Sequence, residues 1–291
     1  MMMKKYIFLF LSLLLLTLGC EEQPVVIPTG NSNSGGSGSS DTIFKNVLLE
    51  DLTGVRCPNC PQAATAIKDM QSVFGKENVI DVGIHGFFLS APVYPEDVDL
   101  RNPFSRSLEF FIQPSAKPAG TINRTLINMN GSVNEYFNLL PDEWPSLVEA
   151  ELLRPADMTL EIDLDYNAGS RELTVTATGK GINEVSDQIN ISIYLVQSGI
   201  VTHQEDEGPI PVIEDYEHER VLLDGMTDFK GDLFAPSLAP DEEITMTFTR
   251  VLPSQEAVKW NVEDMEVIAF LSSGTTEKLE VYYTDVAPII N

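Results

Sequence analysis

The chain has few basic residues. Its 291 residues contain 18 lysines and arginines against 44 aspartates and glutamates, which gives a formal net charge of −26. Proteins that bind nucleic acid neutralise phosphates with clustered lysines and arginines. We therefore exclude nucleic acid as a partner, and we interpret the acidic surface as one that keeps the chain soluble.

Cysteine and histidine are also scarce. The sequence has three of each: Cys20, Cys57, Cys60, His85, His203 and His218. A structural zinc site needs about four ligands. The two closely spaced cysteines supply only two, and the histidines are far apart in the sequence. The sequence thus predicts no metal site and no cofactor.

A long hydrophobic run is missing as well. The most apolar stretch, Tyr6–Leu18, is too short to span a bilayer and follows two lysines, so residues 1–19 are predicted to be a signal peptide. It ends in Thr-Leu-Gly-Cys, which resembles a bacterial lipobox. We expect Cys20 to carry a lipid that anchors the chain to a membrane. An ordinary secretory signal with cleavage nearby is the alternative.

Composition divides the rest of the chain into three parts. Residues 20–42 are rich in Pro, Gly, Ser and Asn, which is typical of a flexible tether. Residues 43–154 alternate between apolar strands and helices, as in an α/β domain with buried parallel strands. Residues 155–291 show period-two alternation in about seven short segments, which predicts an all-β sandwich domain of the immunoglobulin type.

The α/β part has a clear element order. We expect strands over 44–52 and 79–85, a short strand after Pro118, and helices from Cys57 to Gly75, over 105–112 and from Asp142 onward. The last helix carries Trp144, Val148 and Leu152 on one face.

One motif stands out, the Cys57-Pro58-Asn59-Cys60 sequence between an apolar strand and a helix. In this setting a Cys-x-x-Cys pair commonly does redox chemistry. A helix N-terminus would stabilise a thiolate at Cys57, and one helical turn would bring Cys60 close enough to form a disulfide. We expect Cys57 to be the exposed nucleophile and Cys60 to be buried. A permanently closed structural disulfide is the alternative.

Residues 43–154 resemble the thioredoxin superfamily through the strand, the Cys-x-x-Cys at a helix start and a proline entering a later strand. The resemblance implies that Pro118 is the cis-proline that presents a client backbone to the disulfide. It also implies that Asp51 exchanges protons with Cys60, with Glu50 as the competing choice. Arg56 stands where the superfamily usually has Trp, which leaves the redox direction open.

The mature chain resembles a narrower family, the outer membrane protein 28-related lipoproteins of Bacteroidetes. The resemblance rests on three segments: Leu48–Gly54 with the two cysteines, Thr121–Arg124 and Tyr216–Leu222. It implies a thioredoxin-like domain followed by a β domain, held on the outer membrane. The third segment lacks the second histidine that the family often shows, so its role stays open.

Two functions fit these patterns. In the first, a membrane-tethered thiol–disulfide oxidoreductase exchanges with client protein thiols or disulfides; Cys57 attacks and Cys60 resolves. In the second, the thioredoxin-like part is a scaffold and the β domain makes a binding or adhesion lipoprotein. His85 either contacts the disulfide or is an ordinary strand-end histidine, and the acidic residues 205–207 are predicted to form a solvated loop.

Overall fold

The computed structural model describes residues 42–129, 132–134, 140–256, 258–275 and 279–290. The predicted signal peptide, Cys20 and nearly all of the tether lie outside these ranges. Within them, no helix is long and apolar enough to cross a membrane.

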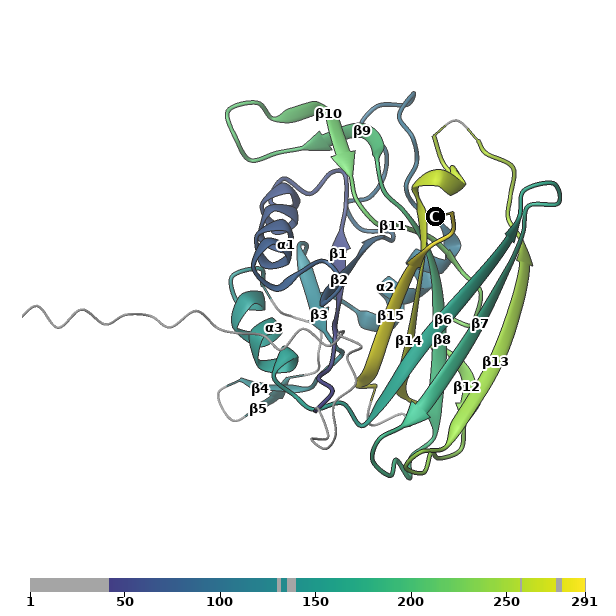
Figure 1. Ribbon diagram of the computed structural model, residues 1–291. Helices are drawn as coiled ribbons and strands as arrows, with labels where there is room; N and C mark the ends of the chain where they lie inside the picture. The colour runs from purple at the N-terminus through teal and green to yellow at the C-terminus, as the bar shows by residue number, and fades with distance from the viewer. Residues whose placement is uncertain (1–41, 130–131, 135–139, 257, 276–278, 291) are drawn as a thin grey trace, which may run out of the picture.

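The first half has the expected alternation of strands and helices (Figure 1). Its elements are β1 (Val47–Thr53), α1 (Cys60–Phe74), β2 (Val79–His85), α2 (Pro103–Ile112), β3 (Ala119–Ile122), β4 (Ile127–Met129), β5 (Ser132–Asn134) and α3 (Trp144–Leu152). β1 pairs with β2 in parallel and with β3 in antiparallel orientation. This mixed sheet confirms that the N-terminal part is thioredoxin-like.

The second half contains the predicted period-two strands. They are β6 (Met158–Asn167), β7 (Glu172–Gly181), β8 (Ile189–Gln197), β9 (Ile200–Glu205), β10 (Val212–His218), β11 (Val221–Gly225), β12 (Asp232–Ala235), β13 (Glu243–Val251), β14 (Met265–Ser273) and β15 (Val281–Pro288), with a 3-10 turn at Val262–Asp264. β13, β7 and β6 form a separate antiparallel sheet, and β9 and β10 form a hairpin.

The remaining strands of the second half continue the sheet of the first. The strand order is β15-β14-β8-β11-β2-β1-β3, and β12 also pairs with β8. The two halves join where Val221 of β11 lies in register with Gly83 of β2, and the Gly83 N–H donates to the Arg220 carbonyl at 2.9 Å. The coarse prediction of α/β followed by β is thus confirmed. The immunoglobulin type of the β part is not confirmed, and the boundary near Arg154 stays a prediction, with strands from both sides sharing one sheet.

Side chains alternate between the two faces of the parallel strands, and each face has its own core. On one face, Val47 and Leu49 of β1 pack with Ile67 of α1 and Trp144 of α3. On the other, Leu48 and Leu52 pack with α2 and with strands of the second half. As predicted, Trp144, Val148 and Leu152 are all buried.

The same alternation decides where polar side chains point. Asp51, Asp81 and His85 occupy positions on the face that α1 covers, whereas Glu50 lies on the opposite face. Figure 1 shows the β9–β10 hairpin extending over the end of the sheet from which the Cys-x-x-Cys loop leads into α1. Alternation along β1 and β2 and the path of this hairpin together position the site.

Candidate functional site

The Cys-x-x-Cys motif forms a tight turn between β1 and α1. The Cys57 N–H donates to the Gly54 carbonyl at 2.9 Å, and the Cys60 N–H donates to the Cys57 carbonyl at 3.1 Å. The two cysteines are joined in a disulfide, with 2.11 Å between the sulfurs and 5.4 Å between the Cα atoms. The predicted junction of strand, cysteine pair and helix is therefore present.

Exposure of the two cysteines differs from the expectation. α1 begins at Cys60, with Pro61 in its first turn, so Cys57 precedes the helix and does not belong to its first turn. Cys57 is 0% exposed and Cys60 is 3% exposed. The prediction that Cys57 is exposed is wrong for the disulfide-bonded state.

The cover over Cys57 comes from residues 204–207, the end of β9 and the start of the following loop; we call this segment the strap. Its backbone donates from Glu205 to the Val55 carbonyl at 2.8 Å and from Glu207 to the Pro58 carbonyl at 3.0 Å. The Gln204 side chain adds hydrogen bonds to the carbonyls of Cys57 at 3.0 Å and Gly54 at 3.3 Å. The strap thus follows the Cys-x-x-Cys turn as an added strand would.

A loop closes the turn from another direction. The Arg56 N–H donates to the Leu89 carbonyl at 2.9 Å, and the Arg56 guanidinium donates to the carbonyls of Pro92 and Val93 at 2.6 and 2.9 Å. Arg56 is the residue that stands where the thioredoxin superfamily usually has Trp. Its guanidinium fastens the 91–93 loop.

Asp51 is buried on the α1 side of β1. It is 5% exposed, and its Oδ1 atom has no hydrogen-bond partner in the described residues. Burial, reinforced by the nearby Asp81 carboxylate and offset by Lys117, raises the pKa of Asp51 to about 8. A carboxyl with this pKa can gain or lose a proton near neutral pH.

Glu50, the competing choice, does a different job on the opposite face. Its two oxygens accept hydrogen bonds from the Arg124 guanidinium at 2.7 and 2.8 Å, and it also binds Thr121 and Tyr194. Burial by itself would raise the pKa of Glu50, but attraction to Arg124 and these hydrogen bonds outweigh burial and lower it. Glu50 is therefore a buried structural group that is charged near neutral pH.

Pro118 lies beside the C-terminal end of β1. It is buried, its peptide bond with Lys117 is cis, and the next residue, Ala119, pairs with Leu52. The Lys117 ammonium donates to the Thr53 carbonyl at 2.7 Å and to Glu109 at 3.2 Å. The structure thus brings Pro118 to the strand that leads into the Cys-x-x-Cys turn, as the superfamily resemblance implied.

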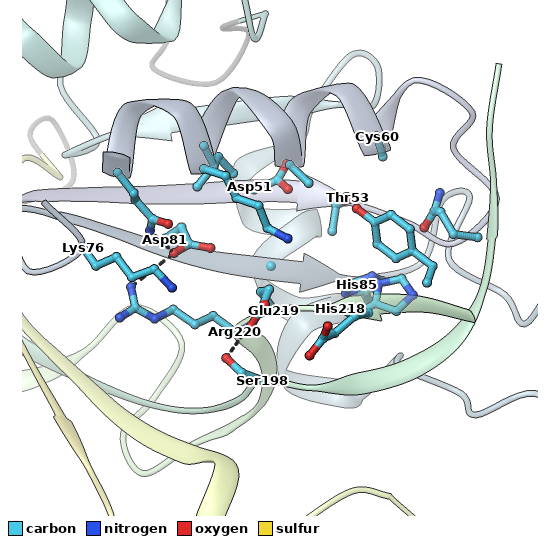
Figure 2. A pocket seen from close by; sticks show the side chains of 18 of the residues that line it. Asp51, Thr53, Cys60, Lys76, Asp81, His85, Ser198, His218, Glu219 and Arg220 are labelled. Carbon is cyan, nitrogen blue, oxygen red and sulfur yellow. Dashed lines mark hydrogen bonds and ion pairs between the residues drawn. The ribbon is translucent and has the colours of Figure 1, made fainter. Parts of the chain in front are cut away.

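A cavity of about 570 Å³ opens next to Cys60 (Figure 2). It lies between α1, the ends of β1 and β2, and the chain from β10 into β11. The polar residues that line its inner part are Asp51, Thr53, Asp81, His85, Gln204, Tyr216 and His218. Cys60 lines this cavity, and Cys57 is not among its lining residues.

Two histidines meet inside the cavity, one from each half of the chain. The rings of His85 and His218 lie edge to face with 5.4 Å between their centroids, as Figure 2 shows. Both ring nitrogens of His85 and the Nε2 atom of His218 lack a hydrogen-bond partner in the described residues. Burial holds the pKa of His85 well below its usual value and lowers the pKa of His218 to about 4, so both rings are neutral near pH 7.

Among the residues that the structure describes, no group of three or more His, Cys, Asp and Glu side chains could hold a metal ion. The acidic residues 205–207, predicted from the sequence to form a solvated loop, belong to the strap. The N–H groups of Glu205 and Glu207 donate hydrogen bonds to the Cys-x-x-Cys turn.

Comparison with known proteins gives the family. The family model described as outer membrane protein Omp28 matches residues 107–286, more than half of the chain. The chain belongs to the Omp28 family. The predicted location is thereby confirmed as well: this Omp28-family protein is an outer membrane lipoprotein.

One solved structure supports the fold. HBP35 of Porphyromonas gingivalis is similar with a TM-score of 0.63 at 19% identity, over 85% of this chain and 76% of that one. A domain of the outer membrane lipoprotein Omp28 from Porphyromonas gingivalis matches with a TM-score of 0.31 at 15% identity, over 46% of this chain and 88% of that one. No curated protein matches this Omp28-family chain.

Sequence reasoning missed several residues of the site. Gln204 carried no signal because a single glutamine in a β segment is unremarkable, and Lys117 attracted attention only through its neighbour Pro118. His218 was within the segment Tyr216–Leu222 that carried the family resemblance, but nothing in the sequence placed it beside His85. In this Omp28-family fold the two meet because β11 joins β2.

Proposed function

We propose that this outer membrane lipoprotein is a thiol–disulfide exchange protein whose reactive centre is Cys57–Cys60. The observation that carries the proposal is the closed disulfide at the β1–α1 junction, in a thioredoxin-like sheet and beside a buried carboxyl, Asp51, with a pKa of about 8. Perturbed carboxyl groups next to a reactive pair are typical of functional sites. A lipid on Cys20 would hold this centre at the membrane.

The chemistry is a two-electron exchange. An incoming thiolate attacks one sulfur of the pair, the Cys57–Cys60 bond breaks, and the leaving sulfur takes the electron pair. A second thiolate then releases the mixed disulfide, so that two thiols become one disulfide and the protein becomes a dithiol. Asp51 is assigned the exchange of protons with Cys60, and Pro118 is assigned the presentation of a client backbone to the disulfide.

A second function keeps support from one observation. Both cysteines are nearly inaccessible, at 0% and 3% exposure, as in a structural disulfide. In that case the protein is a binding or adhesion lipoprotein with a thioredoxin-like scaffold.

The reduction potential distinguishes the two. Equilibration of the full chain with thiol redox buffers, followed by alkylation and mass spectrometry, gives the fraction of dithiol. We expect a potential between about −270 and −120 mV, the range of exchange proteins. A potential below about −300 mV would reject the proposal and favour the structural disulfide.

A further inference from the structure

Access to the disulfide is unequal on its two sides. The Cys57 side is closed by the strap and by the loop through Leu89, both bonded to backbone groups of the Cys-x-x-Cys turn. A protein client approaching along this turn would need the carbonyls of Val55 and Pro58 that the strap already occupies. The folded protein therefore offers no open edge to a polypeptide at Cys57.

The Cys60 side opens into the cavity of about 570 Å³. Cavities of roughly 300–1,000 Å³ are the usual size of small-molecule sites. Cys60 forms part of the cavity wall at the start of α1, next to the α1 residues Ala64 and Lys68. A small molecule entering here reaches the disulfide from the side of Cys60.

Several polar atoms on the inner wall of this cavity lack a hydrogen-bond partner within the described residues. Asp51 Oδ1, both nitrogens of His85 and Nε2 of His218 are unpartnered within the described residues, and each of these side chains is at most 5% exposed. Buried polar groups are normally satisfied by protein, water or ligand. Neutral imidazoles and a protonated carboxyl each provide donors and acceptors, which suits a small polar ligand.

The outer wall carries charges of both signs. Lys68 and Lys76 line it from α1 and the turn that follows. Glu217 lines it from β10, and Glu219 lines it from the chain between β10 and β11. Arg220 is held there by ion pairs with Asp81 and Glu266 at 3.2 and 2.8 Å. A ligand with both an ammonium and a carboxylate would complement such a wall.

We infer that the cavity binds a low-molecular-weight zwitterionic thiol or disulfide, of the kind that cysteine and cystine represent, and that Cys60 is the sulfur with which it exchanges. This inference rests on the proposed function and names its substrate class. The thiolate of the small molecule attacks Sγ of Cys60, the Cys57–Cys60 bond breaks, and Sγ of Cys57 leaves with the electron pair and takes a proton. A second small thiolate attacks the sulfur of the bound half-cystine, which releases a free disulfide and the Cys60 thiolate.

Variants that keep only one cysteine of the Cys57–Cys60 pair test which sulfur reacts. Folded Cys57→Ser and Cys60→Ser proteins are incubated with L-cystine, quenched with acid and measured by intact mass. We expect the Cys57→Ser protein, which keeps Cys60, to gain one half-cystine at least tenfold faster than the Cys60→Ser protein. Faster labelling of the Cys60→Ser protein would overturn the inference.

A cavity-filling pair tests the route in the wild-type background, where neither cysteine is removed. Ala64→Phe fills the cavity wall, and Thr65→Phe places the same side chain on the exposed face of the same helix. We expect reduction of the disulfide by L-cysteine to slow at least fivefold in Ala64→Phe and to stay at the wild-type rate in Thr65→Phe. Equal rates in all three proteins would overturn the cavity route.

Failure of the inference can be told from failure of the proposed function. If insulin, a protein disulfide, is reduced by the dithiol form while cystine is not, the exchange centre stands and the small-molecule substrate is rejected. If the reduction potential is below about −300 mV, both the proposed function and this inference are rejected. Should Cys57→Ser not fold, as judged by circular dichroism, wild-type protein treated with L-cysteine, alkylated and mapped by peptide mass shows which cysteine carries the half-cystine; half-cystine on Cys57 would overturn the inference.

Discussion

The Gln204 side chain donates a hydrogen bond of 3.0 Å to the carbonyl oxygen of Cys57, across 147 residues of sequence. The same amide group also reaches the Gly54 carbonyl at 3.3 Å. Through these contacts the second half of the chain covers the reactive motif of the first. The exposure of Cys57 is therefore set by a hairpin that no thioredoxin-like core by itself contains.

Gln204→Ala should loosen the strap. The change removes one donor from two buried carbonyls that keep their backbone hydrogen bonds, which costs about 0.5–1.5 kcal/mol of stability. We expect the Glu205 and Glu207 N–H groups, which donate to Val55 and Pro58, to exchange with deuterium at least tenfold faster. Gln188→Ala, at an exposed glutamine, is the control and should leave these rates unchanged. Unaltered exchange in Gln204→Ala would show that the backbone bonds alone hold the strap.

Asp51→Asn should stabilise the protein in a pH-dependent way. Because burial raises the pKa of Asp51 to about 8, the folded state holds a proton that the unfolded chain releases above its ordinary pKa of 3.8. Stability is therefore expected to fall as the pH rises from about 4 to about 8. Replacing the carboxyl with an amide removes this penalty. The free energy of unfolding should rise by at most about 5 kcal/mol at pH 8 and by little at pH 4.

Urea unfolding at pH 4.5 and at pH 8 measures the effect. The free energy of unfolding of Asp51→Asn should increase clearly more at pH 8 than at pH 4.5. The control Asp163→Asn, at an exposed position, should change it by the same small amount at both pH values. An equal gain of the Asp51 variant at both pH values would mean that the carboxyl is ionised in the fold and finds other partners.

Local patterns predicted the elements around the site well. β2 has the predicted bounds, 79–85, because a largely apolar strand that is buried on both faces has clear ends. The alternation along β1 also separates Asp51 from Glu50, but the sequence alone left the choice between them open, because it does not show which face α1 covers. The start of α1 was misplaced since Pro58 and Pro61 both suit a first turn, and the fold uses Pro61.

Long-range contacts account for what the sequence did not reveal. The strap bonds to the Cys-x-x-Cys turn mostly through backbone groups, which every residue has and which carry no signal in a sequence. Within the shared sheet, β11 and β2 are paired at a single register position, Val221 with Gly83. Two domains in a row were predicted because a change of periodicity marks a change of element type and does not show whether the strands join one sheet.

Cys20→Ser should release the protein from the membrane fraction. The lipobox-like end of the signal peptide predicts a lipid on Cys20, which lies outside the described residues. Acyl chains on Cys20 would supply the membrane affinity. Fractionation with a high-salt wash measures the loss. Cys57→Ser, which keeps Cys20, must remain in the membrane fraction, and retention of the Cys20 variant would reject the lipid anchor.

Glu50→Gln should destabilise both halves of the protein together. Glu50 on β1 binds the Arg124 guanidinium, and Arg124 and Glu50 both hydrogen-bond the Tyr194 hydroxyl of β8 at 2.9 and 3.2 Å. Arg124 and Glu50 are at most 1% exposed in their side chains, so removing the carboxylate leaves a buried, uncompensated cation, at a cost of about 3–5 kcal/mol.

The pH dependence of this pair has the opposite sign to that of Asp51. Because the pKa of Glu50 is lowered in the fold, its contribution is complete above its ordinary pKa of 4.5 and is lost as the pH falls through the folded value. The difference in free energy of unfolding between the wild-type protein and Glu50→Gln should therefore shrink in acid. Glu243→Gln provides the matched control, because the Glu243–Lys180 pair is 58% and 48% exposed and its loss should cost less than about 1 kcal/mol.

Thermal unfolding followed by far-UV circular dichroism and by tryptophan fluorescence should give one coincident transition, lowered by Glu50→Gln in both signals. Two separate transitions, with only the one reported by Trp144 shifted, would show that the shared sheet does not couple the halves.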